Sequence, residues 1–269
     1  MKHPVPAVAE RPADEAGRLN LLSCNILAGG SVRRYRDYVT HSWKHVLPTG
    51  KRANLDVLAR VIGEFDLVGL QEADAGSLRS GFLNQTQYLA EAAAFPFWSH
   101  QPNRRVSRLA TSSNGLLARM QPDEVLDYPL PGRIPGRGAL WARFGEGEHS
   151  LVVVIAHLSL GPAARMRQLG FIAELLGHHP NVVLMGDLNT PPGSAELKML
   201  YSKTALEPPH ESPATFPSWR PTRAIDHILV SGAITVERRW ALSHPVSDHL
   251  PVAASIVLPS TLGAGARKP

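Results

Sequence analysis

The chain has 269 residues, of which 43% are hydrophobic and 19% are charged, so it can bury a sizeable core and wholesale disorder is excluded. It contains no run that approaches the roughly 18 apolar residues of a membrane-spanning helix. The formal net charge of +5 favours a polyanionic partner or a phosphate-bearing substrate, although a merely basic surface explains it equally well.

The two ends of the chain differ in composition from its middle. Residues 1–17 lack a hydrophobic signal core, and residues 259–269 are rich in Gly, Ala, Pro and Ser. We therefore expect two flexible tails around a single domain of residues 18–258. The one cysteine, Cys24, lies in an apolar run and excludes an intrachain disulfide. A cytoplasmic monomer is the expected form.

Short apolar runs and one helical stripe make up the first half of the chain. Leu55, Leu58 and Ile62 recur at the spacing of one helix face. Gln101–Ser113 is polar and bears arginines, which predicts a loop, and a Pro/Gly-rich loop is expected up to Gly138. In chain order the predicted elements are a strand over 18–24, a helix over 51–64, a strand over 66–70, a helix capped by Asn84 and a strand over 114–120.

Strands follow one another directly in the second half. Residues 139–144 and 151–156 predict a hairpin, and a helical stripe from Met166 ends at Gly177. Consecutive strands disfavour a purely alternating doubly wound sheet and favour two packed mixed sheets with helices outside. The remaining predicted elements are a strand over 182–185, a helix capped by Ser194, and strands over 225–230, 234–237 and 252–257.

A polar or ionisable cluster appears at the end of a predicted strand, or close to it, six times. Any single case has an ordinary explanation, because strands commonly end in polar loops. Six cases that bear Asp, Glu, Asn and His, and no Cys, indicate a site for an oxygen-preferring cation beside a histidine base. The clusters are Asn25, Gln71-Glu72, His157, Asp187-Leu188-Asn189, Asp226-His227 and Ser247-Asp248-His249.

These clusters sit in the segments Leu22–Asn25, Val68–Glu72, Ala156–Leu158, Met185–Asn189, Ile225–Leu229 and Ser247–Pro251. In this order they resemble the motif set of the endonuclease/exonuclease/phosphatase superfamily, over about residues 19–257. One such motif alone is weakly specific, whereas the ordered set is strongly specific. The resemblance implies an α/β fold, namely the four-layer α/β/β/α sandwich of deoxyribonuclease-like proteins. It also implies a metal-dependent hydrolase that cleaves phosphate esters with metal-activated water.

A metal site follows from the same resemblance. It implies that Glu72 binds Mg²⁺ or Mn²⁺, with Asn25 and Asp248 completing the protein ligands. Mg²⁺ takes few protein ligands and keeps several waters, so this short set is sufficient. The structural alternatives are a surface carboxylate for Glu72 and a turn for Asn25. Gln71 is expected to support the metal ligands without binding the metal.

The resemblance also assigns catalytic roles. Asp187 orients or deprotonates the attacking water, and Asn189 holds that water or a phosphate oxygen. His249 is the catalytic histidine, and Asp226 fixes its tautomer, which predicts a pKa for His249 above the reference of about 6.5. Whether His249 accepts or donates a proton stays open. His157 is expected to donate to a nonbridging phosphate oxygen.

Further residues are predicted to contact the substrate. Asn114 resembles a substrate-side asparagine of related bacterial proteins, with a turn at the start of a strand as the alternative. Arg104, Arg105 and Arg108 form a basic stretch that suits phosphate binding, and a solvated loop explains them equally well.

The substrate itself is open among three interpretations. The first is a phosphodiesterase that acts on nucleic acid or nucleotide, and the second is a phospholipid or inositol-phosphate hydrolase. The third is a catalytically inactive binding module, which the full set of ionisable residues disfavours. Ala73 and Asp74 stand where abasic-site endonucleases typically carry a lysine soon after the glutamate, which counts against a dedicated DNA-repair role. Thr215–Trp219 faintly resembles both lipid-associated bacterial members and phosphoinositide phosphatases.

Overall fold

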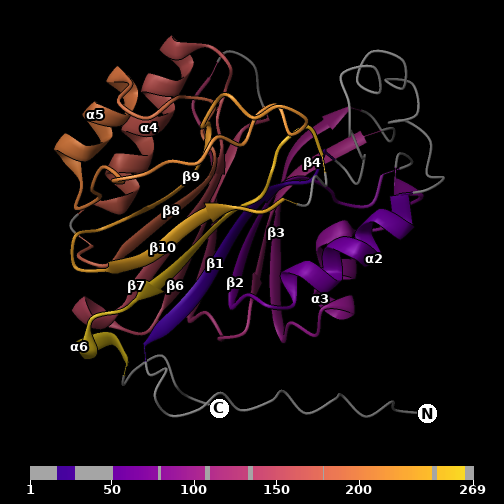
Figure 1. Cartoon of the computed structure of the whole chain (residues 1–269), viewed down its shortest axis with the longest axis horizontal. Helices are drawn as coiled ribbons and strands as arrows, with labels where there is room; N and C mark the ends of the chain where they lie inside the picture. Colours follow the sequence, from indigo (N-terminus) through magenta and orange to yellow (C-terminus); the bar gives the residue numbers. More distant parts are fainter. Residues whose placement is uncertain are drawn as a thin grey trace.

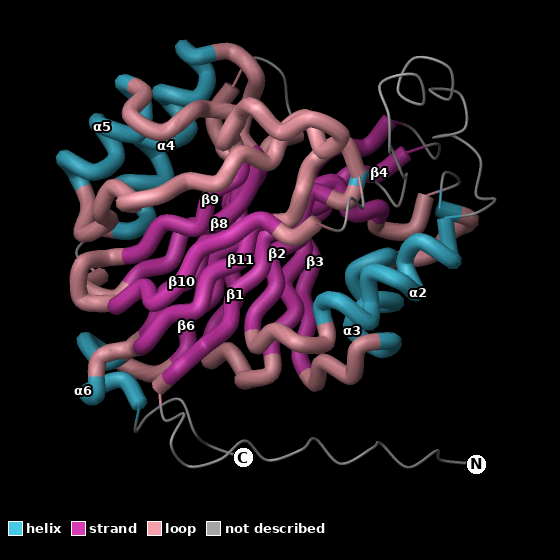
Figure 2. The backbone as a smooth tube through the Cα atoms, in the orientation of Figure 1, coloured by secondary structure: helices cyan, strands magenta, loops and turns pink. Residues whose placement is uncertain are grey.

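The computed structural model describes residues 17–27, 51–77, 80–106, 110–132, 136–177, 179–243 and 247–263. Two β-sheets pack face to face, and α-helices lie on the outer side of each sheet (Figure 1). The strands occupy the centre of the molecule, with the helices on either side of them (Figure 2). The four-layer α/β/β/α sandwich that the sequence predicts is thereby confirmed.

The six-stranded sheet is built around β1 and β2, which run parallel. Leu21 lies opposite Leu67 and Asn25 lies opposite Gln71, so both strands end at the same edge of the sheet. The strand order is β10 (Thr235–Ala241), β11 (Val252–Val257), β1 (Arg18–Asn25), β2 (Leu67–Asp74), β4 (Ala110–Ala118) and β3 (Phe97–Val106).

The five-stranded sheet has β7 and β8 at its centre, and both are buried along their whole length. Such burial is typical of parallel strands that are covered on both faces. His157 lies opposite Asp187 in this parallel pair, and Asp226 lies opposite Asp187 in the antiparallel pair of β8 and β9. The strand order is β5 (Glu124–Pro129), β6 (Gly138–Phe144), β7 (Leu151–His157), β8 (Val182–Asp187) and β9 (Asp226–Val230), with the 3-10 turn η5 (Gly147–His149) before β7.

Two helices begin and one ends where the sequence predicts it, whereas α2 ends at Ile62, two residues before the predicted end. The Asn84 side chain accepts a hydrogen bond from Gln87 N at 3.2 Å, and the Ser194 hydroxyl accepts one from Leu197 N at 3.2 Å. Gly177, with φ 48°, ends α4. Two helices, α2 (Lys51–Ile62) and α3 (Gln85–Ala92), pack on the six-stranded sheet, and two more, α4 (Pro162–Leu176) and α5 (Ala195–Lys203), pack on the five-stranded sheet.

The core between the sheets is apolar and closely packed. Leu21 and Leu67 from one sheet meet Ile155 and Met185 from the other, and each of the four is at most 1% exposed. Burying a side chain of this size stabilises the fold by roughly 1.5–3 kcal/mol. Gly69 allows the sheets to approach, because a Cβ at this position would lie 3.1 Å from both Ile155 and Met185.

Two segments for which the sequence predicts loops are strands. Gln101–Ser113 lies largely within β3 and β4, and β5 occupies part of the expected loop before Gly138. Both β3 and β5 are edge strands, and β5 is mostly exposed, so they lack the apolar alternation that reveals a half-buried strand. In β3 a register shift between Pro102 and Arg104 interrupts the pattern further.

The C-terminal end also departs from the expectation. The composition predicts a flexible tail from residue 259, but Ser260–Gly263 form the short helix α6, and Leu262 is buried in the core between the sheets. One leucine in a Gly/Ala/Pro-rich stretch gives too weak a signal to predict this docking. Residues 1–16 and 264–269 lie outside the described residues. None of the described helices is long and apolar enough to cross a membrane.

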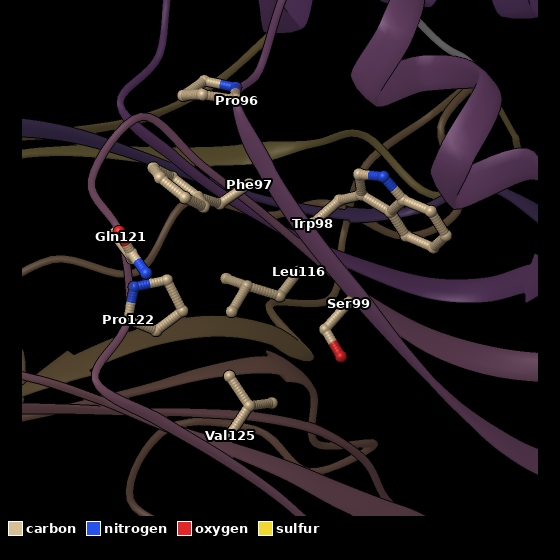
Figure 3. A pocket seen from close by; sticks show the side chains of 8 residues that line it. All are labelled: Pro96, Phe97, Trp98, Ser99, Leu116, Gln121, Pro122 and Val125. Atoms are coloured by element: carbon tan, nitrogen blue, oxygen red, sulfur yellow. The ribbon is translucent and has the colours of Figure 1, made fainter.

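A pocket of about 230 Å³ lies where the edge strands β3 and β5 approach each other (Figure 3). Ala118, at the end of β4, pairs with both Phe97 and Leu67, the first residues of β3 and β2. The pocket is therefore at the opposite end of the sheet from Asn25. Its lining residues are Pro96, Phe97, Trp98, Ser99, Leu116, Gln121, Pro122 and Val125.

Candidate active site

The polar clusters predicted at strand ends converge at one end of the sandwich. The six-stranded sheet brings Asn25 and Glu72, and the five-stranded sheet brings His157, Asp187 and Asp226. Asn25 joins the two sheets, because its Nδ2 donates to Asp187 Oδ2 at 3.2 Å and to Glu72 Oε1 at 3.5 Å. The carboxyl ends of the parallel strands therefore meet across the sandwich as well as within each sheet.

β7 and β8 approach each other closely beside the site. Gly186 has φ 148°, and a Cβ there would lie 1.8 Å from the carbonyl oxygen of Ala156, so only glycine fits. The next residue, Asp187, is held beside His157, whose Nε2 lies 3.3 Å from Asp187 Oδ2. Asp187 Oδ1 accepts a hydrogen bond from Asn189 N at 3.0 Å. The glycine of the Gly-Asp-Leu-Asn motif thus positions the carboxylate that follows it.

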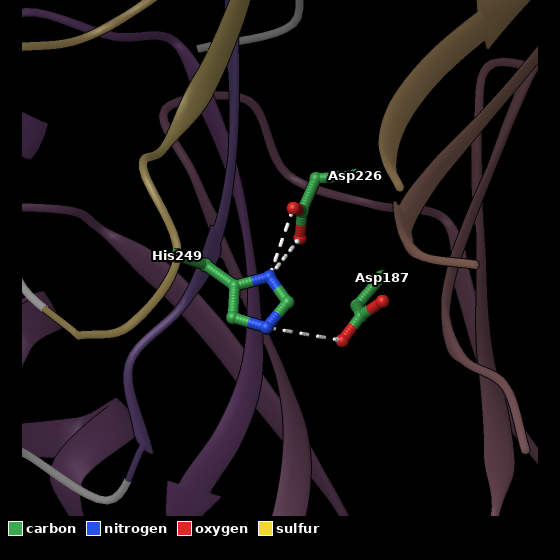
Figure 4. A group of neighbouring side chains, drawn as sticks. All are labelled: Asp187, Asp226 and His249. Atoms are coloured by element: carbon green, nitrogen blue, oxygen red, sulfur yellow. Dashed lines mark hydrogen bonds and ion pairs between the residues drawn. The ribbon is translucent and has the colours of Figure 1, made fainter. Parts of the chain in front are cut away.

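The His249 ring lies between two carboxylates (Figure 4). Its Nδ1 is 2.9 Å from Asp226 Oδ2, and its Nε2 is 3.9 Å from Asp187 Oδ2. Burial by itself lowers the pKa of His249, but the charge and hydrogen bond of Asp226, together with Asp187 and Asp248, raise it to about 10. The direction agrees with the sequence-based prediction, and it favours the imidazolium form of the ring.

Asp187 and His157, which lie beside His249, also have shifted pKa values. Burial and repulsion by Asp226 raise the pKa of Asp187 to about 7. Burial, aided by the charges of Arg137 and His249, lowers the pKa of His157 well below its ordinary value. The site therefore combines a histidine whose neutral form is favoured, a histidine whose cationic form is favoured and a carboxylate with a raised pKa, an arrangement suited to acid–base chemistry.

Glu72 has an unusual backbone conformation at the end of β2. Its φ is 58°, in the left-handed region, and the pairing of β2 with β4 shifts register between Leu70 and Ala73. A non-glycine residue held there costs on the order of 1–3 kcal/mol. The side chain is 29% exposed, and its Oε1 lies 3.8 Å from His157 Nε2. Burial and the nearby charge of Asp248 raise the pKa of Glu72.

The oxygen atoms of Glu72, Asp248 and Asn25 suit a cation that prefers oxygen ligands. Glu72 is close enough to Asp248 for their charges to repel, and a divalent cation between such groups would relieve that repulsion. Asn25 Oδ1 accepts a hydrogen bond from Leu27 N at 3.1 Å, which leaves one lone pair for a metal ion. Within the described residues, Asp187, Asp226 and His249 form a second group whose potential ligand atoms all lie within 4.8 Å of one another.

The sequence profile of the endonuclease/exonuclease/phosphatase family matches residues 22–249. This span reaches from β1 to His249 and includes every site residue described above. The chain belongs to the endonuclease/exonuclease/phosphatase family. Members of this family hydrolyse phosphate esters and generally depend on a divalent metal, and this chain is a hydrolase of that class.

Solved structures of the family share the fold at low sequence identity. A family protein from Bacteroides thetaiotaomicron is 20% identical, with 90% of this chain and 98% of that chain covered and a TM-score of 0.67. A mannosyl-6-phosphatase from the same organism is 20% identical, with 89% and 100% covered and a TM-score of 0.66. D. rerio TDP2, complexed with a single strand DNA product, is 16% identical, with 89% and 98% covered and a TM-score of 0.63. No curated protein sequence matches significantly.

Several residues support the family's site without lying at its centre. Gln71 is fully buried, and its Oε1 accepts a hydrogen bond from the Ser23 hydroxyl at 3.3 Å. Asn189 Nδ2 donates to the carbonyl oxygen of Leu158 at 2.9 Å and so fixes the loop that follows His157. This contact uses part of the amide that the sequence assigns to the substrate.

The hydrogen bonds of Asn114 reach Gln101, Gly138 and Ile155, none of which belongs to the site described above. Asn114 is fully buried in β4, and its Nδ2 donates to the carbonyl oxygens of Gly138 at 2.8 Å and Ile155 at 3.4 Å. Asn114 therefore joins the two sheets, which a motif comparison cannot reveal because both acceptors are distant in sequence. The substrate contact predicted for it has no support in these hydrogen bonds.

The arginines near the site differ from those that the sequence singles out. Arg104 and Arg105 lie in β3 rather than in a loop, and Arg108 is outside the described residues. Arg137, which sequence reasoning missed, directly precedes β6. Burial raises the pKa of Glu72 and lowers that of His157, and the positive charge of Arg137 acts to lower both pKa values, so its guanidinium lies near both groups. Arg137 directly precedes β6, which pairs with β7, the strand that ends at His157. This hairpin, which the sequence predicts, is the signal that points to Arg137.

Proposed function

We propose that this chain is a Mg²⁺- or Mn²⁺-dependent phosphodiesterase that acts on nucleic acid or nucleotides. The observation that carries the proposal is the surroundings of the Asp187 carboxylate. Its Oδ2 lies 3.3 Å from His157 Nε2 and 3.9 Å from His249 Nε2, and it accepts a hydrogen bond from Asn25. The Asp187 carboxylate, a potential base, thus lies beside two imidazoles that can contact phosphate oxygens. The carboxylate of Glu72 lies next to this group.

Glu72, Asn25 and Asp248 would hold the metal ion. All three offer oxygen atoms, which are the ligands that Mg²⁺ and Mn²⁺ prefer. When bound, the cation would polarise a phosphoryl oxygen and lower the pKa of a bound water. The left-handed backbone of Glu72 supports the assignment, because strained residues that a fold maintains are concentrated at functional sites.

Asp187 is the proposed general base. A pKa of about 7 leaves it partly ionised at neutral pH, so it can take a proton from water while the water oxygen attacks phosphorus. The new P–O bond forms as the bond to the leaving oxygen breaks. Because the backbone N–H of Asn189 holds Oδ1, the other oxygen of Asp187 stays directed at the two histidines.

The two histidines are proposed as donors. His249 Nδ1 lies against both oxygens of Asp226, and its Nε2 lies near Asp187, so carboxylates favour a proton on each ring nitrogen. As an imidazolium it would stabilise the charge that develops on the phosphate and protonate the leaving oxygen. His157, held neutral by burial, would donate its N–H to a nonbridging oxygen. These contacts favour donation over acceptance, the alternative that the sequence leaves open.

Two arginines near the reacting groups support a substrate with more than one phosphate. The charge of Arg137 acts to lower the pKa values of Glu72 and His157 at one side of the site. Arg223 is exposed, and its Cζ lies 5.5 Å from the centroid of the Phe216 ring, which is itself 4.8 Å from the His249 ring. Guanidinium groups bind phosphate oxygens well, and neighbouring phosphates of a nucleic acid would extend past the one that is cleaved.

The proposed function is tested by a substrate panel. Purified protein is incubated with bis-p-nitrophenyl phosphate, p-nitrophenyl phosphate, single-stranded DNA and single-stranded RNA, in Mg²⁺, in Mn²⁺ and in excess EDTA. We expect hydrolysis of the diester and of at least one oligonucleotide, and only when metal is present. Full activity in EDTA would exclude the metal-dependent mechanism, and activity on the monoester alone would exclude a diesterase.

Two exposed apolar side chains favour a second candidate, hydrolysis of a phospholipid or inositol phosphate. Phe82 is 68% exposed in the loop after β2, and Leu160 is 76% exposed in the loop after β7. Both loops follow strands that end at the site, so these side chains would suit contact with lipid. Sphingomyelin vesicles and soluble inositol phosphates added to the panel separate the candidates. If lipid is the substrate, Phe82→Ser and Leu160→Ser should reduce vesicle hydrolysis and leave the diester rate unchanged.

A further inference from the structure

The segment Thr215–Ser218 docks against the residues that carry the catalytic histidine. Leu250 N donates to Thr215 O at 2.9 Å, and Ser218 N donates to Asp248 O at 2.7 Å, so main-chain bonds flank His249 on both sides. The Ser218 hydroxyl adds a bond to the carbonyl oxygen of Ser247 at 2.8 Å. The segment is thereby fixed to the chain around His249 independently of any contact with the imidazole.

From this fixed segment, the Thr215 hydroxyl contacts Asp226. Thr215 is fully buried, and its Oγ1 donates to Asp226 Oδ2 at 2.5 Å. The same oxygen lies 2.9 Å from His249 Nδ1. An ionised carboxylate can only accept, so Thr215 and His249 are both donors to it. The three residues form a chain of hydrogen bonds that ends at the imidazole.

The next residue, Phe216, contacts the imidazole itself. Its ring centroid lies 4.8 Å from that of His249, with the two ring planes inclined by 52°. Tilted pairs at this separation are within the favourable range for aromatic rings. Thr215 therefore contacts the carboxylate of the Asp226–His249 pair, and Phe216 contacts its ring.

We propose that Thr215 and Phe216 are positioning residues that set the orientation of the Asp226–His249 pair, an inference that rests on the proposed function. The torsion of an aspartate carboxylate about its last bond is broad, so packing alone does not fix which way the two oxygens point. A second donor on Oδ2 fixes this rotation, and the aromatic contact limits rotation of the imidazole. Neither side chain exchanges a proton with the substrate.

The experiment removes the hydroxyl and then restores it. Thr215→Val keeps the shape of the side chain and loses the donor, whereas Thr215→Ser keeps the donor. We expect Thr215→Val to lower kcat on bis-p-nitrophenyl phosphate by roughly tenfold to hundredfold, with KM within about twofold, because misalignment of a catalytic group affects turnover more than binding. Thr215→Ser should restore kcat to within about threefold of wild type.

A matched control separates positioning from folding. The Thr204 hydroxyl donates to the carbonyl oxygen of Leu200 at 3.0 Å, outside the site, so Thr204→Val loses a comparable bond and should keep the wild-type kcat. Phe216→Leu gives an independent test through the ring contact and should also lower kcat more than it raises KM. Wild-type kcat in Thr215→Val would overturn the inference, as would equal losses in Thr215→Val and Thr215→Ser. An inactive wild type would refute the proposed function instead.

Discussion

The two ends of the sandwich differ in the side chains that they bring together. At one end, the pocket between β3 and β5 is lined by side chains that carry no ionisable group (Figure 3). At the other end, carboxylates and histidines are buried within hydrogen-bond distance of one another (Figure 4). The second end is the candidate active site because its groups have shifted pKa values and mutual contacts.

The difference has a physical origin in strand direction. β1 and β2 are parallel, as are β7 and β8, so their carboxyl ends place polar residues together at one end. The other end receives the amino ends of the same strands, together with Phe97 and Leu116 near the edge. Buried charge is costly unless it is paired, so a fold retains such a cluster only where its pairing or its function offsets the cost.

The largest expected effect tests the catalytic end directly. His249→Ala should lower kcat by roughly 10²–10⁴, the usual scale for the loss of a positioned acid or base. The thermal unfolding midpoint should also fall, because the buried carboxylate of Asp226 loses its histidine partner, so the rates are compared well below both midpoints. Steady-state kinetics on bis-p-nitrophenyl phosphate measures the effect, and a variant with wild-type turnover would remove His249 from the mechanism.

A smaller effect should follow removal of the glutamate's charge. Glu72→Gln keeps the size of the side chain and weakens metal binding, so we expect the Mg²⁺ concentration for half-maximal activity to rise by at least about tenfold. Metal titration of the activity measures the shift. If Glu72 were only a surface carboxylate, the metal dependence of the variant would equal that of wild type.

The next prediction concerns pH and the pair at the catalytic end. Asp226→Asn removes the largest of the charges that oppose burial, so the pKa of His249 should fall from about 10 in metal-free protein, although Asp187 and Asp248 still raise it. The stability that the raised pKa contributes is fully present below about pH 6.5 and is lost as the pH rises through about 10. NMR titration of the His249 imidazole in EDTA measures its pKa in both proteins. A pKa in Asp226→Asn equal to that of wild type would contradict the assigned pair. Turnover should fall less than in His249→Ala, because the imidazole is still present.

A more modest change should separate polymeric from small substrates. Arg223→Gln is expected to raise KM for a single-stranded oligonucleotide several-fold and to reduce the salt dependence of KM, because one phosphate contact is lost. The rate on bis-p-nitrophenyl phosphate, which has a single phosphate, should stay within about twofold of wild type. A parallel loss on both substrates would mean that Arg223 supports the site rather than a second phosphate.

The smallest effect is expected at the other end. Trp98→Ala enlarges the pocket and removes a side chain that is 38% exposed, so we expect some loss of thermal stability and turnover within about twofold of wild type. Unfolding and activity assays on the same preparation test this. A selective loss of activity with the stability unchanged would break the comparison and assign a functional role to the pocket.

Much of the structure is determined by local sequence patterns. The caps at Asn84 and Ser194 and the stop at Gly177 depend on neighbours a few residues away, and they are found where the sequence predicts them. The buried strands are also predicted, because apolar runs that end in polar residues have the same local signal in any fold. The ordered motifs identify the family, and the family specifies the sandwich.

Other features were decided by tertiary structure. The edge strands β3 and β5 lack apolar alternation and become strands because a neighbouring strand pairs with them. Asn114 has the same motif context whether it contacts substrate or joins the sheets, and its two carbonyl acceptors, Gly138 and Ile155, come from the second sheet. Arg137 acts on Glu72 and His157 although it belongs to none of the six polar clusters that the sequence shows. Local periodicity encodes which residues form an element, whereas the groups that meet across two sheets depend on the register and packing of strands that are far apart in sequence.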